Sequence, residues 1–90
     1  MDLSVIIPVY NEERRIVDTI SRLSGYLSQQ DHTGEIIISD DGSHDGGPAL
    51  VKERFTGNPL VRMIRAEQNQ GKGAAVRRGV LAARGEHIIF

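Results

Sequence analysis

The chain has 90 residues, of which 39% are hydrophobic and 26% charged, so it can form at most one small globular domain. Its formal net charge of −1 gives no general attraction to nucleic acid or to an anionic membrane. It contains no cysteine and no long apolar run, which excludes disulfides, thiolate metal sites and a membrane-spanning segment within these residues. We therefore expect a cytoplasmic location and no nucleic-acid partner.

The first part of the chain predicts a strand, a helix and a second strand. A β-branched run over residues 3–9 lacks helical periodicity, which is typical of a strand buried on both faces. Residues 12–29 predict a helix with Asn11 as its N-cap and one apolar stripe, made by Ile16, Ile20, Leu23 and Leu27. After a polar loop, residues 35–40 predict another buried strand.

The second part continues this alternation. Residues 48–55 and 73–83 predict helices, and residues 60–65 and 87–90 predict strands. We expect the later helix to pack through a face formed by Val76, Val80 and Ala83. Alternating strands and helices favour an α/β fold with a Rossmann-like, doubly wound and mainly parallel sheet. Because the chain stops inside an apolar strand, we expect an incomplete sheet whose exposed edge pairs with a second copy.

Polar segments follow the first three predicted strands, which is where open α/β sheets bind their ligands. These segments are Pro8 to Glu12, Ser39 to Ser43, and Asn69 to Gly73. Right-handed crossovers bring all three to one edge of the sheet, so an aromatic ring, a pair of carboxylates and a lysine can share one cleft. Taken singly, each segment is explained as a strand end, a turn or the start of a helix. Their convergence favours a shared binding site.

Each of these residue types suits the binding of a nucleotide. Tyr10 can stack on a base, a contact worth about 1–3 kcal/mol. The carboxylate of Asp40 or Asp41 can accept hydrogen bonds from a base N–H or from ribose hydroxyls. Lys72, next to two glycines at the start of a helix, can approach a diphosphate together with free backbone N–H groups.

Other candidate motifs are weaker. The segment around Lys72 is no P-loop, because Gly73 stands where serine or threonine is required. His44 lies near two aspartates, but a metal site is disfavoured because His32 and His87 have no reason to join it. The cations of the last helix and the loop after it predict a solvated face, with contact to acidic lipid as a less favoured use: Arg77, Arg78 and Arg84.

Three segments together resemble the family 2 glycosyltransferases, which have the GT-A fold. They are Ser4 to Glu13, Ser39 to Asp45, and Asn69 to Gly79. The third, with the residues up to Glu86, is most similar to the dolichyl-phosphate and polyprenyl-phosphate glucosyltransferase branch. The resemblance implies that Asp41 lies near the base of a bound nucleotide, in a pocket lined by Pro8, Tyr10, Glu12, Ser39, Asp41 and Lys72.

The resemblance also implies a reaction, the inverting transfer of a hexose to an acceptor such as polyprenyl or dolichyl phosphate, with UDP-glucose as the foremost donor. A divalent cation, Mg²⁺ or Mn²⁺, would offset charge on the departing diphosphate. The family's Asp-x-Asp metal motif belongs directly after the fourth strand, and the chain ends at Phe90. We therefore expect residues 1–90 to supply only the nucleotide pocket of the catalytic domain, without a catalytic or metal-binding residue.

Two alternatives stay open. A receiver-like signalling domain also holds Mg²⁺ with an acidic pair, but that pair is expected after the first strand, and here it follows the second. A non-catalytic α/β interaction domain is favoured by the exposed apolar edge expected at residues 87–90.

Overall fold

The computed structural model describes residues 1–31 and 33–90 of the chain. Its strands are β1 (Leu3–Val9), β2 (Gly34–Asp40), β3 (Val61–Arg65) and β4 (His87–Ile89). They form one four-stranded parallel sheet in the order β3-β2-β1-β4. All of the predicted strands are present, with bounds close to those expected.

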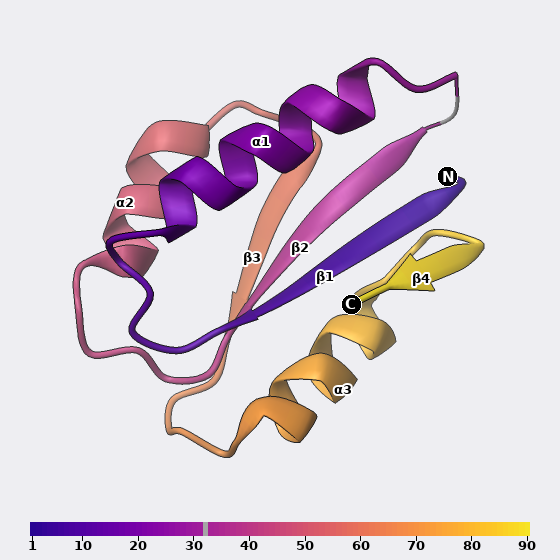
Figure 1. Cartoon of the computed structure of the whole chain (residues 1–90). Helices are drawn as coiled ribbons and strands as arrows, with labels where there is room; N and C mark the ends of the chain where they lie inside the picture. The colour runs from indigo at the N-terminus through magenta and orange to yellow at the C-terminus, as the bar shows by residue number, and fades with distance from the viewer. Residues whose placement is uncertain (32) are drawn as a thin grey trace.

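Helices cover both faces of the sheet (Figure 1). α1 (Ile16–Ser28) and α2 (Gly47–Phe55) pack against each other on one face, and α3 (Lys72–Ala82) lies on the other. β2 and β3 add on one side of β1 and β4 adds on its other side, so the connection through α3 crosses to the second face. The structure confirms the predicted Rossmann-like, doubly wound α/β fold.

The register of the sheet brings three loops to one edge. β1 and β2 pair from Leu3 opposite Gly34 through Val9 opposite Asp40, so these two strands end at the same level. β3 pairs with β2 as far as Arg65 opposite Asp40, and it ends there too. The loops that follow these three strands therefore leave the sheet together, at the lower left of Figure 1.

The core lies between the sheet and α1. Every residue of β2 is buried, as expected for a central strand with both faces covered. Ile36 and Ile38 are fully buried in one cluster with the apolar stripe of α1, which consists of Ile16, Ile20 and Leu27. Leu23, predicted in the same stripe, is partly buried and packs against this cluster. The predicted packing face of the first helix is thus confirmed.

The predicted start of the first helix was wrong. α1 begins at Ile16 rather than at residue 12, and Asn11 is not its N-cap. Asn11 has a left-handed backbone with a φ of 53°, and its side-chain oxygen accepts a hydrogen bond from the His44 N–H at 2.9 Å. Its own N–H donates to Ser43 Oγ at 2.9 Å. Asparagine tolerates positive φ, so here it links the loops after β1 and β2 instead of capping a helix.

The packing face of α3 also differs from the prediction. Ala75 and Gly79 are its buried residues, whereas Val76 and Val80 are half-buried. A Cβ atom at Gly79 would lie only 2.3 Å from Cγ2 of Ile6, so glycine is required for this close approach of α3 to β1. The smallest side chains face the sheet because they let the helix come nearest to it, and the valines lie at the margin of the contact.

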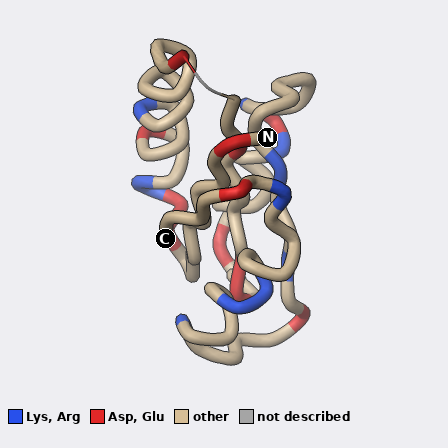
Figure 2. Tube along the Cα trace, turned by 90° about the vertical axis from the view of Figure 1, so that its right-hand side faces the viewer, with Lys and Arg blue, Asp and Glu red and all other residues tan. Residues whose placement is uncertain are grey.

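The surface of the described residues combines mixed charge with an apolar edge. Acidic and basic segments are interspersed along the trace rather than gathered on one side (Figure 2). β4 pairs only with Leu3 to Val5 of β1, and at this edge Ile88, Ile89 and Phe90 are 38%, 54% and 76% exposed. Within residues 1–31 and 33–90, no helix has the length and apolar character needed to cross a bilayer.

Candidate functional site

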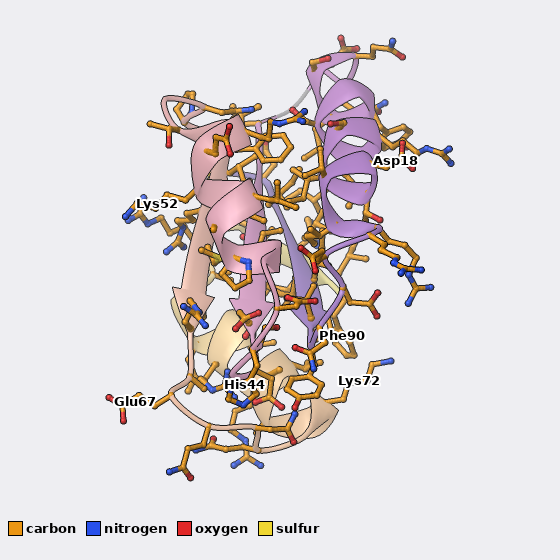
Figure 3. All side chains as sticks on the ribbon, turned by 90° about the vertical axis from the view of Figure 1, so that its left-hand side faces the viewer. Asp18, His44, Lys52, Glu67, Lys72 and Phe90 are labelled. Carbon is orange, nitrogen blue, oxygen red and sulfur yellow. The ribbon has the colours of Figure 1, made fainter. Side chains whose placement is uncertain are left out.

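A cavity of about 350 Å³ opens at the edge of the sheet where the loops after β1, β2 and β3 meet. Its wall combines residues of these loops with the start of α3: Pro8, Val9, Tyr10, Glu12, Asp41, Asn69, Lys72 and Ala75. Five of the six residues that the sequence predicted for a pocket are in this wall. Lys72 and His44 are labelled at this end of the molecule in Figure 3. The winding of the sheet thus brings distant segments around one cavity.

Ser39, the sixth predicted residue, does not line the cavity. It is fully buried in β2, and its hydroxyl donates a hydrogen bond of 2.6 Å to the backbone oxygen of Ala75 in α3. Its place in β2 turns the side chain toward the helix rather than toward the loops. Ser39 therefore fastens α3 to the sheet beneath the cavity.

Asp41 is buried beside the cavity and accepts three donors. The Gln70 N–H lies 3.1 Å from both carboxylate oxygens, the Gly71 N–H lies 2.7 Å from Oδ2, and the Arg78 guanidinium lies 2.6 Å from Oδ1. Burial alone would raise the pKa of Asp41, but the hydrogen bonds from Gln70, Arg78 and Gly71 outweigh it and lower the pKa below its ordinary value. Asp41 is therefore an anion at neutral pH.

Asp40 has a different role from its neighbour. It is 1% exposed, and its carboxylate accepts hydrogen bonds from the Ser43 N–H at 2.9 Å and the Ser43 hydroxyl at 2.5 Å. Arg65 of β3 donates to the same carboxylate at 3.2 Å. The sequence left open which aspartate faces a ligand, and only Asp41 of the two lines the cavity. Asp40 fixes the turn that follows β2.

Tyr10 and Lys72 are exposed residues in the wall of the cavity, as is Asn69. Tyr10 is 42% exposed at the end of β1, and Lys72 is exposed as the first residue of α3. The Lys72 ammonium has no hydrogen bond or ion pair with another residue of the described chain. Glu12 is already engaged, because Arg15 binds both of its oxygens at 2.8 Å. An aromatic face and a free cation can therefore meet a ligand from two sides.

Arg78 is the residue that the sequence interpretation placed wrongly. It was expected on a solvated face with Arg77 and Arg84, yet its side chain is only 25% exposed and pairs with Asp41. Arg77 and Arg84 are exposed, as expected. Nothing in the spacing of these arginines separates Arg78 from the others. The difference arises from the face of α3 that packs on β1, where Gly79 permits the close approach.

A third buried carboxylate lies at the opposite end of β2. Glu35 accepts hydrogen bonds from the Ser4 hydroxyl at 2.6 Å, Arg62 at 2.9 Å and the Arg84 N–H at 2.8 Å. Burial would raise the pKa of Glu35, but these hydrogen bonds and the Arg62 charge lower it below the ordinary value. Arg62 also donates to the backbone oxygen of Ala82. This cluster fastens the loop after α3 to three strands.

The described residues contain no group of three or more histidine, cysteine, aspartate or glutamate side chains that could hold a metal ion. His44 is exposed and donates its backbone N–H to Asn11, and His32 lies outside the described residues. A larger cavity of about 500 Å³ lies between α2 and β3 and includes none of the predicted site residues. The cavity at the ends of the strands is therefore the candidate site.

Comparison with known proteins identifies the family of the chain. Glycosyl transferase family 2 matches residues 4–90. The chain is 38% identical over 97 residues to a dolichyl-phosphate beta-glucosyltransferase of Drosophila melanogaster, and the match covers 100% of this chain and 30% of that protein. The chain thus spans about a third of the length of the relative.

Solved structures share the fold. S. aureus TarS 1-349 in complex with UDP-GlcNAc matches with a TM-score of 0.83 and 29% identity, over 100% of this chain and 26% of that one. Mannosyltransferase PcManGT of Pyrobaculum calidifontis, in complex with GDP-Man and Mn²⁺, matches with a TM-score of 0.81 and 26% identity, over 96% of this chain and 25% of that one. The sequence match and the fold agree, and the chain belongs to glycosyl transferase family 2.

Proposed function

We propose that residues 1–90 form the nucleotide-sugar-binding part of a glycosyltransferase catalytic domain, with UDP-glucose as the foremost donor. The observation that carries this proposal is the cavity of about 350 Å³ with Tyr10, Asp41 and Lys72 in one wall. Family membership favours this function over the receiver-like and non-catalytic alternatives. The complexes of TarS with UDP-GlcNAc and of PcManGT with GDP-Man support a nucleotide sugar as the ligand.

In this proposal, Tyr10 and Lys72 bind the two ends of the nucleotide. The exposed ring of Tyr10 stacks on the base, which contributes about 1–3 kcal/mol. Lys72 and the free N–H groups of the first turn of α3 face the diphosphate, where positive charge and the helix dipole both favour an anion. Pro8, Glu12 and Asp41 complete the wall between them.

For the acceptor, we propose a polyprenyl or dolichyl phosphate, as the name of the Drosophila relative indicates for that protein. The attacking phosphate oxygen is already largely anionic near neutral pH, so inverting transfer needs little help from a general base. Positioning of the two substrates and stabilisation of the departing diphosphate then supply most of the acceleration. The full-length protein would act at the cytoplasmic face of a membrane.

The described residues around the cavity do not fit a divalent cation. Asp41 already accepts Gln70, Gly71 and Arg78, and Glu12 is bound by Arg15. The Mn²⁺ in the PcManGT complex supports a cation in the full-length enzyme, where we propose that an Asp-x-Asp motif beyond Phe90 supplies the ligands. Transfer itself would require those residues, so the 90-residue chain alone is expected to be inactive.

The proposed function is tested by titrating UDP-glucose with Mn²⁺ into the full-length protein in a calorimeter. We expect saturable binding that weakens about 5- to 100-fold in Tyr10→Ala, because the stacking surface is lost. Tyr26→Ala is the matched control, since Tyr26 is 60% exposed on α1 and is not part of the cavity. Absence of saturable binding, or equal affinities in Tyr10→Ala and the wild type, would overturn the proposal.

We also propose that the 90-residue chain pairs with a second copy through β4. The support is the exposed apolar edge of Ile88, Ile89 and Phe90, beside the part of β1 beyond Val5 that has no partner on this side in the described sheet. Sedimentation equilibrium at high micromolar concentration is expected to give a dimer. A monomer under these conditions would contradict pairing of the edges.

A further inference from the structure

Arg78 lies next to the cavity without lining it. It projects from α3, its guanidinium is 2.6 Å from Oδ1 of Asp41, and a second nitrogen lies 3.5 Å from the backbone oxygen of Asp40. Its side chain is 25% exposed, and Arg78 is absent from the wall of the cavity. Arg78 therefore reaches the site only through the loop that follows β2.

The same Asp41 carboxylate holds the backbone of the loop before α3. The Gln70 and Gly71 N–H groups both donate to it, so three donors from two segments converge on one buried anion. Gly71 has a φ of 101°, a left-handed conformation that few other residues adopt. Gly42, with a φ of 79°, lies so close to the backbone of Gln68 that a Cβ would be 2.7 Å away. The Asp41 carboxylate thus fastens the two loops, whose backbones lie in close contact at Gly42.

Lys72 follows directly from this fastened loop. Because the Gly71 N–H is bound to Asp41, the backbone that leads into α3 has a fixed position, and with it the lysine in the wall of the cavity. The Arg78 charge offsets the cost of burying Asp41, so the carboxylate can remain ionised and accept both backbone amides. Loss of either side chain would release the loop.

We propose that Arg78 is a positioning residue of this pocket: through Asp41 it holds the Gln70–Gly71 backbone and thereby sets Lys72 where a diphosphate binds. The loop is then preorganised before the ligand arrives, so little ordering entropy is lost on binding. The part that concerns the diphosphate rests on the proposed function. The part that concerns the loop does not.

Nuclear magnetic resonance on the 90-residue chain without ligand tests the loop. In Arg78→Ala and in Asp41→Asn we expect the exchange protection of the Gln70 and Gly71 amides to fall about tenfold or more, because their acceptor is displaced or weakened. Arg77→Ala is the matched control, since Arg77 is the exposed neighbour on the same helix. Unchanged protection of both amides in both variants would overturn the proposal.

Titration of UDP and of uridine, with Mn²⁺, into the full-length protein and its Arg78→Ala variant tests the consequence for the ligand. We expect Arg78→Ala to lower the affinity for UDP about tenfold more than the affinity for uridine, because only the binding of UDP depends on the placement of Lys72. A purely structural role would weaken both ligands equally, and that result would overturn the positioning role. If the wild-type full-length protein binds no UDP while the amides of the 90-residue chain still respond to Arg78→Ala, the proposed function fails and the positioning of the loop stands.

Arg78→Lys keeps the test open if Arg78→Ala does not fold. Lysine retains the charge but lacks the planar fork that reaches Asp41 and the Asp40 oxygen together. We expect an intermediate loss of Gln70 and Gly71 protection in Arg78→Lys, with the circular dichroism of the wild type. Full protection in a folded Arg78→Lys together with a folded, fully protected Asp41→Asn would contradict the proposal.

Discussion

The two ends of strand β2 carry similar polar clusters in different surroundings. At its beginning, buried Glu35 accepts Arg62, Ser4 and the Arg84 N–H. Just after its end, buried Asp41 accepts Arg78 and the amides of the loop before α3. Both carboxylates have a lowered pKa, and each is held by one arginine and at least one backbone N–H. Together they fasten α3 to the sheet at both of its ends.

The difference lies in what surrounds each cluster. Asp41 borders a cavity of about 350 Å³ that also has an exposed tyrosine and an unpaired lysine in its wall. Glu35 lines none of the five main cavities of the described chain, and only its partner Arg62 lies in the wall of one, the cavity between α2 and β3. A buried ion pair with a lowered pKa is therefore no sign of a binding site by itself. We propose that the adjoining cavity and its unengaged groups distinguish a binding cluster around Asp41 from a structural cluster around Glu35.

The largest effect on both carboxylate clusters is expected when α3 is moved away from the sheet. Gly79→Val places a side chain where even Cβ would lie 2.3 Å from Ile6, and we expect a loss of about 3 kcal/mol in unfolding free energy. Both clusters would loosen together. Gly25→Val is the control, because nothing lies within 4 Å of its Cβ position on α1. Urea denaturation measures both variants, and equal stabilities would contradict the close packing of α3.

Removal of Glu35 should separate stability from binding. Glu35→Ala leaves Arg62, Ser4 and the Arg84 N–H without their acceptor, and we expect unfolding free energy to fall by about 2 kcal/mol. UDP affinity of the folded protein should stay within about twofold, because the cluster lies at the other edge of the sheet. Glu67→Ala, at an exposed loop position, is the control. A large loss of UDP affinity in Glu35→Ala would erase the distinction between the two clusters.

A smaller effect is expected from the free cation of the site. Lys72→Gln should lower the affinity for UDP about three- to tenfold at low salt. The loss should become smaller as the salt concentration rises, because salt screens an exposed charge. Lys52→Gln, on the far side of the molecule in Figure 3, should leave the affinity unchanged. Titrations at two salt concentrations measure this difference. Equal losses in the two variants would show that Lys72 has no local role.

The smallest change is expected from mild acid. The pKa values of Asp41 and Glu35 are lower in the folded protein than in the unfolded chain. Their contribution to the unfolding free energy is therefore complete when the pH is above the unfolded pKa values, and it is lost as the pH falls through the folded pKa values. Ordinary carboxylates titrate near about 4, so we expect the contribution of these two groups to be constant from pH 7 to 5 and to fall below about 4. Denaturation of the wild type and of Glu35→Gln at each pH isolates one group. A Glu35 contribution that already falls between pH 7 and 5 would contradict its lowered pKa.

The sequence predicted the fold well because its evidence is local. The β-branched runs at 3–9 and 35–40 have no helical period, and the glycine-rich loops mark their ends. Alternation with helices then requires parallel strands, which carries the loops after them to one edge. The sequence therefore predicts that Tyr10, Asp41 and Lys72 share one cavity, and all three lie in its wall.

What the sequence could not predict depends on which face of an element packs. Arg77 and Arg78 are adjacent and alike, and only the approach of α3 to Ile6 decides that Arg78 reaches Asp41. Ser39 likewise follows the alternation of β2 toward α3, away from the loops. Asn11 satisfies the preferences of a cap and of a left-handed turn equally, and its partners in the loop after β2 select the turn.

The hydrogen bond from the Gly85 N–H to Ser4 Oγ has a consequence for how the chain folds. It joins positions 81 apart, across the pair of strands β1 and β4. Closing a loop of this length costs conformational entropy before the contact can stabilise the chain, so we expect β1 and β4 to pair slowly. During synthesis on a ribosome, β1 emerges first yet keeps one edge open until β4 arrives. We therefore expect β1 to be the strand most exposed to misassembly while the protein is being made.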